Sequence, residues 1–148
     1  MLNENLKLTG ELQIVVTGSN GQVKENVLVP NLVVTVGKNF VASRMTGTAS
    51  AVMSHMAVGA GAVAPVVGDT ALGSELGRVS LTNVGGIATN NTVEFIASFP
   101  AGTGTGALTE AGIFNAASAG TMLCRTTFAV VNKGADDSMA ITWRVTVN

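Results

Sequence analysis

The sequence predicts an all-β protein, namely an antiparallel, jelly-roll-like β-sandwich of about eight strands with one short helix and a long glycine-rich arm. Segments rich in β-branched residues recur along the 148-residue chain, and turn-forming residues separate them at intervals of roughly 8–15 residues. Heptads and repeats of fixed period, which would indicate a coiled coil or a solenoid, are absent. We expect a single sandwich domain over residues 1–148, with 47–75 as the arm.

The clearest strand pair is an N-terminal hairpin. Residues 6–17 end in an apolar run, residues 18–21 (Gly-Ser-Asn-Gly) supply a turn, and residues 23–29 return antiparallel to the first strand. Residues 31–36 are expected to form another short extended segment.

A helix of two to three turns is expected over residues 37–46. Four apolar residues recur near helical spacing: Val36, Phe40, Val41 and Met45. We expect Thr35 to cap this helix, Gly47 to end it, and Lys38 and Arg44 to lie on its outer side.

The arm, residues 47–75, is rich in small residues and glycine and lacks regular periodicity, which predicts a long loop with one embedded strand at 54–58. It also lacks the charge of ordinary disordered segments, so we expect an interaction arm that neighbouring molecules order. Glu75 and Arg78 are close enough in sequence to form an ion pair that anchors it.

The second half of the chain predicts five further strands, at residues 78–84, 92–99, 111–115, 121–131 and 138–147. Two of them alternate clearly, with one face made of Val93, Phe95, Ala97 and Phe99 and the other of Ile141, Trp143, Val145 and Val147. Residues 101–106 are expected to be a flexible connection and 132–137 a polar hairpin loop, and Gly112 is a candidate β-bulge.

Charge is scarce in this chain. Hydrophobic residues make up 47% and charged residues 11%, against roughly 25% in an average protein, and the net charge is −1. This balance gives no electrostatic basis for binding nucleic acid or a membrane, and no apolar stretch is long enough to cross a bilayer. We therefore expect an assembly subunit whose surface other chains cover, and self-association as a dimer or trimer.

No catalytic, cofactor or metal site is expected. Residues 59–64 match the loose dinucleotide-binding fingerprint, but Pro65 and the glycines after it interrupt the helix that this motif needs. Cys124 and His55 could form a nucleophile–base pair only if the fold brought them together, and no motif surrounds either residue. Cys124 lies in a predicted strand, where a free cysteine is usually a small buried hydrophobic residue.

Two further patterns have ordinary explanations. Asp136 and Asp137 could ligate calcium, but calcium takes six to eight oxygen ligands, and an aspartate pair beside Gly134 is typical of a turn. The six aromatic residues fall mostly on predicted core faces, which leaves few platforms for stacking sugars or bases.

Four segments resemble small virion proteins of tailed bacteriophages, and together they extend from residue 31 to the C-terminus. These are Asn-Leu-Val-Val-Thr-Val-Gly-Lys-Asn-Phe-Val-Ala at 31–42, the glycine-rich stretch at 56–78, Leu-Thr-Glu-Ala-Gly-Ile-Phe-Asn-Ala at 108–116, and Asp-Asp-Ser-Met-Ala-Ile-Thr-Trp-Arg-Val at 136–145. Proteins of this group include head-decoration, tail-fibre and other structural components, so the resemblance implies a virion component without an enzymatic role.

The resemblance favours a capsid decoration, or cement, protein that is made in the host cytoplasm and binds the major capsid protein on the capsid exterior. A short chain without a shaft suits this role better than a fibre, and bound subunits stabilise an assembled shell by mass action. A tail, neck or fibre-attachment component is the alternative, and a carbohydrate-binding sandwich is the second alternative. The expected contact residues are Leu2, Leu6, Leu8, Val58, Val63, Pro65, Val66, Val67 and Leu72.

Overall fold

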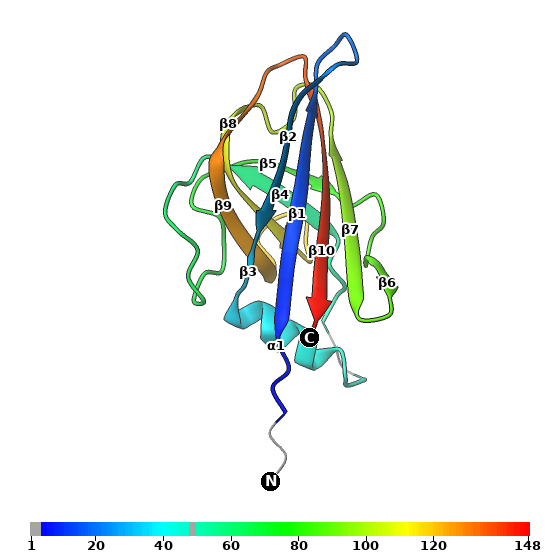
Figure 1. Cartoon of the computed structure of the whole chain (residues 1–148). Coiled ribbons are helices and arrows are strands. Elements are labelled where there is room, and N and C mark those ends of the chain that lie inside the picture. The colour runs from blue at the N-terminus through cyan, green and yellow to red at the C-terminus, as the bar shows by residue number, and fades with distance from the viewer. Residues whose placement is uncertain (1–3, 48–49) are drawn as a thin grey trace.

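The computed structural model of the protein describes residues 4–47 and 50–148. Its elements are β1 (Leu8–Thr17), β2 (Val23–Pro30), β3 (Leu32–Val33), α1 (Thr35–Ser43), β4 (His55–Gly59), β5 (Glu75–Ser80), β6 (Ile87–Thr89), β7 (Thr92–Phe99), β8 (Gly106–Phe114), β9 (Met122–Lys133) and β10 (Ser138–Val147). The strands form two antiparallel sheets of five. The first sheet has the order β2-β1-β10-β7-β6 and the second the order β3-β9-β8-β4-β5 (Figure 1).

The predicted antiparallel sandwich is confirmed. The described residues form ten strands rather than about eight. Strand β3 lies within the extended segment expected at 31–36, whereas β6 was not predicted, because its three residues are too few to show a periodic pattern. The N-terminal hairpin forms as predicted, with β1 paired to β2 on one side and to β10 on the other.

The main core lies between the two sheets and is built by alternation along their strands. Leu12, Ile14 and Val16 of β1 are at most 1% exposed, and the intervening residues face outward. The two predicted alternating faces, on β7 and β10, also point into this core. Trp143 is fully buried there, and its indole Nε1 donates a hydrogen bond to Asn31 Oδ1 at 2.9 Å.

Helix α1 packs across one end of the sandwich (Figure 1) and begins two residues earlier than predicted. Val34 is the N-cap and offers no side-chain hydrogen bond, so the expectation that Thr35 caps the helix was wrong. The backbone N–H of Thr35 instead donates to the carbonyl of Val67, at 2.8 Å. A segment distant in sequence therefore satisfies one of the free N–H groups at the helix start.

The helix also ends earlier than predicted. Arg44 is the C-cap, so Gly47 does not terminate the helix, and Met45 lies beyond its end with 89% of its surface exposed rather than on the inner face. Lys38 and Arg44 are exposed, as predicted.

Strand β8 is longer than predicted, because residue 106 of the expected flexible connection already pairs with β9. Its register shifts lie on either side of Gly112 rather than at it. Residues 110–114 are all buried, which shows that both faces of β8 are covered. The outer face is covered by a second, small core of Val34, Ala57, Phe114 and Met122, with Val36 and Leu72 packed against it.

Candidate functional site

The segment predicted as an extended arm is folded back on the body of the protein. After β4, residues 60–74 form a closed loop, here called the 60–74 loop, before β5 begins. The ends of this loop meet, since the N–H of Ala60 donates to the carbonyl of Ser74 at 2.9 Å. Compact loops with adjoining ends are often functional surface elements. The loop projects beside β9, at the left of the view in Figure 1.

The carboxylate of Glu110, on β8, holds both ends of the loop. It accepts hydrogen bonds from the backbone N–H groups of Gly61 at 2.8 Å, Gly73 at 2.8 Å and Ser74 at 2.7 Å. Such close approach requires glycine, because a Cβ on Gly61 would lie 2.5 Å from Glu110 Oε1. The glycine-rich composition of the segment is therefore explained in part by the approach of its backbone to a buried carboxylate.

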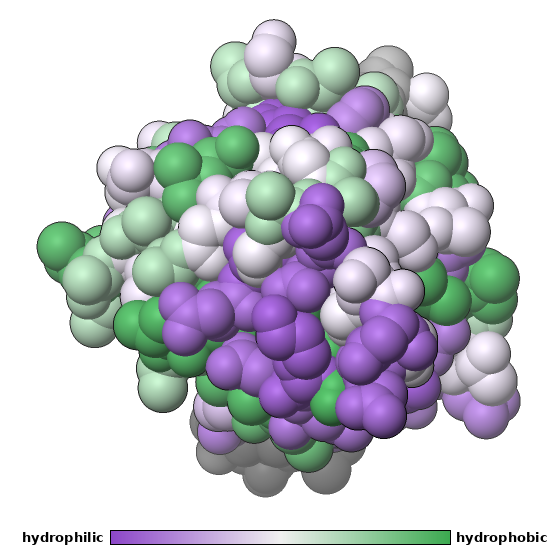
Figure 2. Space-filling view, turned by 90° about the horizontal axis from the view of Figure 1, so that it is seen from above, coloured by the Kyte–Doolittle hydropathy of each residue, from purple (hydrophilic) through white to green (hydrophobic). Residues whose placement is uncertain are grey.

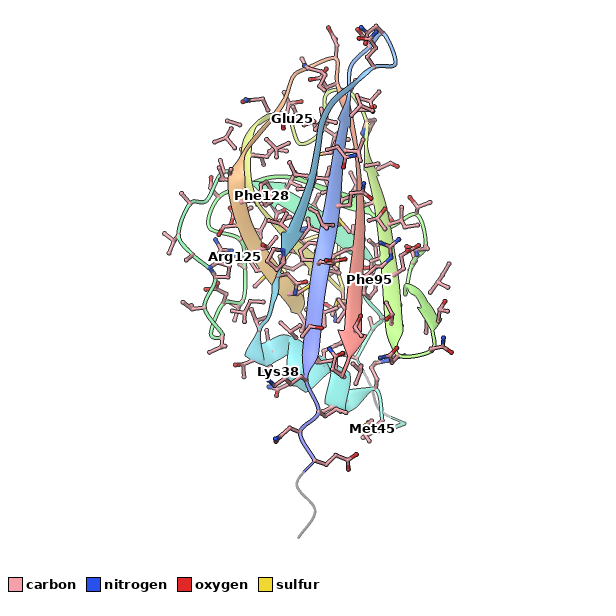
Figure 3. All side chains as sticks on the ribbon, in the orientation of Figure 1. Glu25, Lys38, Met45, Phe95, Arg125 and Phe128 are labelled. Carbon is pink, nitrogen blue, oxygen red and sulfur yellow. The ribbon has the colours of Figure 1, made fainter. Side chains whose placement is uncertain are left out.

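Arg125, on β9, completes this attachment. Its Nε and Nη2 donate to Glu110 Oε2, at 3.2 and 2.9 Å. Two further bonds reach the loop: Nη1 donates to Asp69 Oδ2 at 2.9 Å, and Nη2 donates to the carbonyl of Val63 at 3.0 Å. Figure 3 shows the Arg125 side chain on the side of β9 that faces the loop. Glu110 is 0% exposed and Arg125 3% exposed, so the pair is shielded from water.

The environment of Glu110 keeps it ionised. Burial by itself raises the pKa of this carboxyl, but the N–H groups of Ser74 and Gly73, the Arg125 side chain and the N–H of Gly61 together outweigh burial and lower the pKa below its ordinary value. Both carboxylate oxygens are already engaged by these donors. The cluster is therefore suited to holding a loop in place rather than to acid–base chemistry.

The tip of the loop presents apolar side chains to solvent. Val63 is 78% exposed, Val66 56% and Val67 53%, and these three residues are here called the valine tip. The N–H of Val66 donates to Asp69 Oδ2 at 3.0 Å, so the tip is held by the same aspartate that pairs with Arg125. Figure 2 shows, in contrast, that the end of the sandwich with the β1–β2 and β9–β10 turns is strongly hydrophilic.

The predicted contact residues do not form one surface. Val58 is 0% exposed in the main core, so the expectation that it contacts a partner was wrong: it precedes the loop, on β4. Leu72 is partly buried in the small outer core, and Pro65 is partly exposed beside the valine tip.

The predicted contact residues of the N-terminal segment lie elsewhere. Leu6 is 78% exposed at the end of the sandwich that α1 covers, where Leu8 is partly buried at the start of β1. Leu2 lies outside the described residues. The N-terminal segment and the loop are thus two separate surfaces.

The predicted ion pair at the end of the arm is present. Arg78 Nη2 lies 2.7 Å from Glu75 Oε1, and the Arg78 guanidinium stacks over the ring of Phe114 at 3.8 Å from the ring centroid. It also donates to the carbonyl groups of Ala116 and Ala119. Arg78 therefore attaches β5 to the turn after β8.

The other residues considered as candidates for chemistry are Cys124, His55 and Asp137. Cys124 is fully buried, which raises the pKa of its thiol, and His55 Nδ1 lies 2.8 Å from Ser54 Oγ. Asp137 accepts the N–H of its own turn, from Gly134, and pairs with Lys24 at 2.7 Å. Within residues 4–47 and 50–148, no three histidine, cysteine or acidic side chains lie close enough together to hold a metal ion.

Sequence reasoning missed the residues that shape the loop, Glu110 and Arg125. A signal was present, because each is a charged residue within a strand of otherwise small or apolar residues: Glu110 in Leu-Thr-Glu-Ala-Gly-Ile and Arg125 in Met-Leu-Cys-Arg. Charges in such positions are almost always paired when buried. The partner of each could not be read from the sequence.

No family model matches the chain, and comparisons with curated proteins and with solved structures give no match. The only helix in the described residues, α1, has nine residues and is too short to span a membrane.

Proposed function

We propose that this chain is a non-enzymatic structural protein of a bacteriophage virion. The role we favour is that of a capsid decoration protein, which binds the shell of the major capsid protein and stabilises the head. The observation that supports this most directly is the valine tip, three exposed apolar side chains on a loop that buried charges hold in place. The sequence resemblance of residues 31–148 to phage virion proteins supplies the biological context.

An exposed apolar tip is the kind of feature that a protein–protein interface covers. Where exposed apolar side chains gather on a soluble protein, they often mark an interaction site. The tip is also preorganised, because Glu110, Arg125 and the N–H of Thr35 all hold the loop. Docking a rigid loop loses less conformational entropy than ordering a flexible one, so a small contact area can bind usefully.

The composition supports burial of the surface in an assembly. With 11% charged residues, the chain has few groups to keep an isolated subunit soluble. The carbohydrate-binding alternative lacks a platform, because no aromatic residue is among the exposed large hydrophobic residues of the described chain.

Copy number per purified virion, measured by quantitative mass spectrometry against the major capsid protein, tests the proposal. Hundreds of copies in a fixed ratio to the capsid protein are expected of a decoration protein. A few to a few dozen copies would instead assign the protein to the tail, neck or fibre attachment. Absence from the particle would overturn both virion roles.

A second experiment tests the docking surface. The triple variant Val63→Ser, Val66→Ser, Val67→Ser should fold normally, because these side chains are exposed, and should fail to rebind shells that lack the protein. The matched control is Leu28→Ser with Val130→Ser, which changes exposed apolar residues on β2 and β9. Normal rebinding by the triple variant would show that the shell is bound elsewhere.

A further inference from the structure

The end of the sandwich that α1 covers, here called the α1 end, contains an apolar cavity of about 240 Å³. It reaches from the helix into the space between the sheets, so that core residues of both sheets line it, among them Phe95, Leu123 and Val145. These core residues are still 3–5% exposed, whereas most of the core is at 0%. The single charged residue in the lining is Arg44.

A second hollow, of about 550 Å³, adjoins this cavity on the neighbouring face of α1 and shares Leu8, Val41 and Val147 with it. Lys7 and Lys38 line the second hollow. Figure 3 shows Lys38 on α1 and Met45 just beyond the C-terminal end of the helix, both at this end of the molecule, and Phe95 in the body of the sandwich above the helix.

Three cations that form no side-chain ion pair with another described residue line these two hollows. Among the described residues, no ion pair involves Lys7, Lys38 or Arg44, although Glu4 is also exposed in the N-terminal segment. The other cations are engaged elsewhere: Lys24, Arg78, Arg125 and Arg144 form ion pairs, and Lys133 is buried and donates to the carbonyl of Pro100. Arg44 Nη1 donates only to a carbonyl, that of Ser50.

We propose that the α1 end binds a single anionic amphiphile, an aliphatic chain that carries a carboxylate. The chain occupies the apolar cavity, and its carboxylate pairs with Arg44 in the lining of that cavity, while Lys7 and Lys38 add positive charge from the adjoining hollow. The cavity is larger than an engineered apolar cavity of about 150 Å³ that stays dry and binds benzene. A free amphiphile fits better than a lipid that stays in a bilayer, because the cavity reaches residues that are at least 95% buried.

Titration calorimetry of the full chain with decanoate, below its micelle concentration, tests this proposal. We expect saturable binding at one site, with affinity at least about tenfold higher than for decanol or decyltrimethylammonium, which have the same chain without the negative charge. Amide chemical-shift changes should centre on α1, Val52 and the start of β1. The same titration is repeated, as a separate experiment, with anionic phospholipid vesicles in place of decanoate.

Variants separate the two halves of the site. Lys38→Gln with Arg44→Gln should weaken decanoate binding at least about tenfold, whereas Arg144→Gln, a cation on β10 that lines neither hollow, should leave it unchanged. Val52→Phe, at a half-exposed position in the cavity lining, should reduce decanoate and decanol binding alike. Val41→Phe, from the helix side, is the second filling variant if Val52→Phe does not fold.

Several results would overturn the proposal. These are the absence of saturable decanoate binding, equal binding of decyltrimethylammonium, shift changes confined to another face, and binding to vesicles without binding to free decanoate. The test uses no virion, so its outcome is independent of the proposed structural role.

Discussion

Glu110 and Arg125 are diagonal neighbours on β8 and β9. The register pairs Gly112 with Arg125 and Glu110 with Thr127, and Arg125 Nη2 lies 2.9 Å from Glu110 Oε2. Because both side chains are also bonded to residues 60–74, one pair joins two strands and the loop. The position of the valine tip therefore depends on charges that lie beneath it.

Glu110→Gln is expected to destabilise the protein by about 3–5 kcal/mol, because it leaves the buried Arg125 without its carboxylate. Urea unfolding followed by circular dichroism measures this loss. The control is Glu94→Gln, which breaks a partly exposed pair with Arg144 and should change the unfolding free energy by at most about 1 kcal/mol. Similar losses of unfolding free energy in both variants would contradict the conclusion that Glu110 neutralises a buried Arg125.

The two charges should also be coupled. The double variant Glu110→Gln, Arg125→Gln is expected to lose less stability than the sum of the single variants, with an interaction energy of about 0.5–3 kcal/mol. A double-mutant cycle in urea measures this quantity. Strict additivity would mean that each side chain acts only through its own bonds to the loop.

Acid should destabilise the fold through Glu110. Its pKa is lower in the folded protein than the ordinary value of 4.5, so its contribution to stability is fully present above pH 4.5 and is lost as the pH falls through the folded-state pKa. Unfolding free energies measured between about pH 3 and about pH 6 should therefore fall less steeply with acid in Glu110→Gln.

Asp137 should make a second, separate contribution to stability, and acid should remove this contribution too. The hydrogen bond from Lys24, followed by that from the Gly134 N–H, lowers the pKa of Asp137 below its ordinary value of 3.8. Asp137→Asn should therefore also flatten the acid limb of the stability curve. Parallel curves for wild type and both variants would exclude these two carboxylates as the source.

Leu72→Ala tests the apolar part of the loop attachment. Leu72 packs against the small outer core and is partly exposed, so we expect a loss of about 1–2 kcal/mol, below the 2–5 kcal/mol typical of fully buried leucines. Amide exchange should accelerate in residues 60–74 and stay slow in β1 and β10. Leu28→Ala, at a 64% exposed position, is the control and should cost less than about 0.5 kcal/mol.

Gly37→Ala tests how closely α1 approaches the second sheet. A Cβ on Gly37 would collide with the carbonyl oxygen of Leu123, so the helix must move. We expect the free energy of unfolding to fall by about 1–3 kcal/mol. Gly47→Ala, where the added methyl group meets nothing within 4 Å, should be neutral or slightly stabilising. Thermal unfolding of both variants gives the comparison, and equal melting temperatures would refute the close contact.

Much of the fold was predictable because half-buried strands leave a period-two pattern in the sequence. The boundaries of β7 and β10 and their buried faces match the prediction for this reason. In β8 the predicted strand, 111–115, covered residues that are all buried up to 114, and it missed residues 106–110, although their burial alternates. Met45 was misplaced because apolar spacing indicates a helical face but not the residue at which the helix ends.

The sequence by itself determined the class of the protein, since local propensity and alternation decide which segments become strands and which faces are apolar. It also showed a glycine-rich segment with little charge. Only the tertiary structure decided that this segment folds back, because the bonds of Glu110 and Arg125 to residues 61–74 join positions 36 to 62 residues apart. Contacts at such separations depend on strand order and register, which local patterns do not specify.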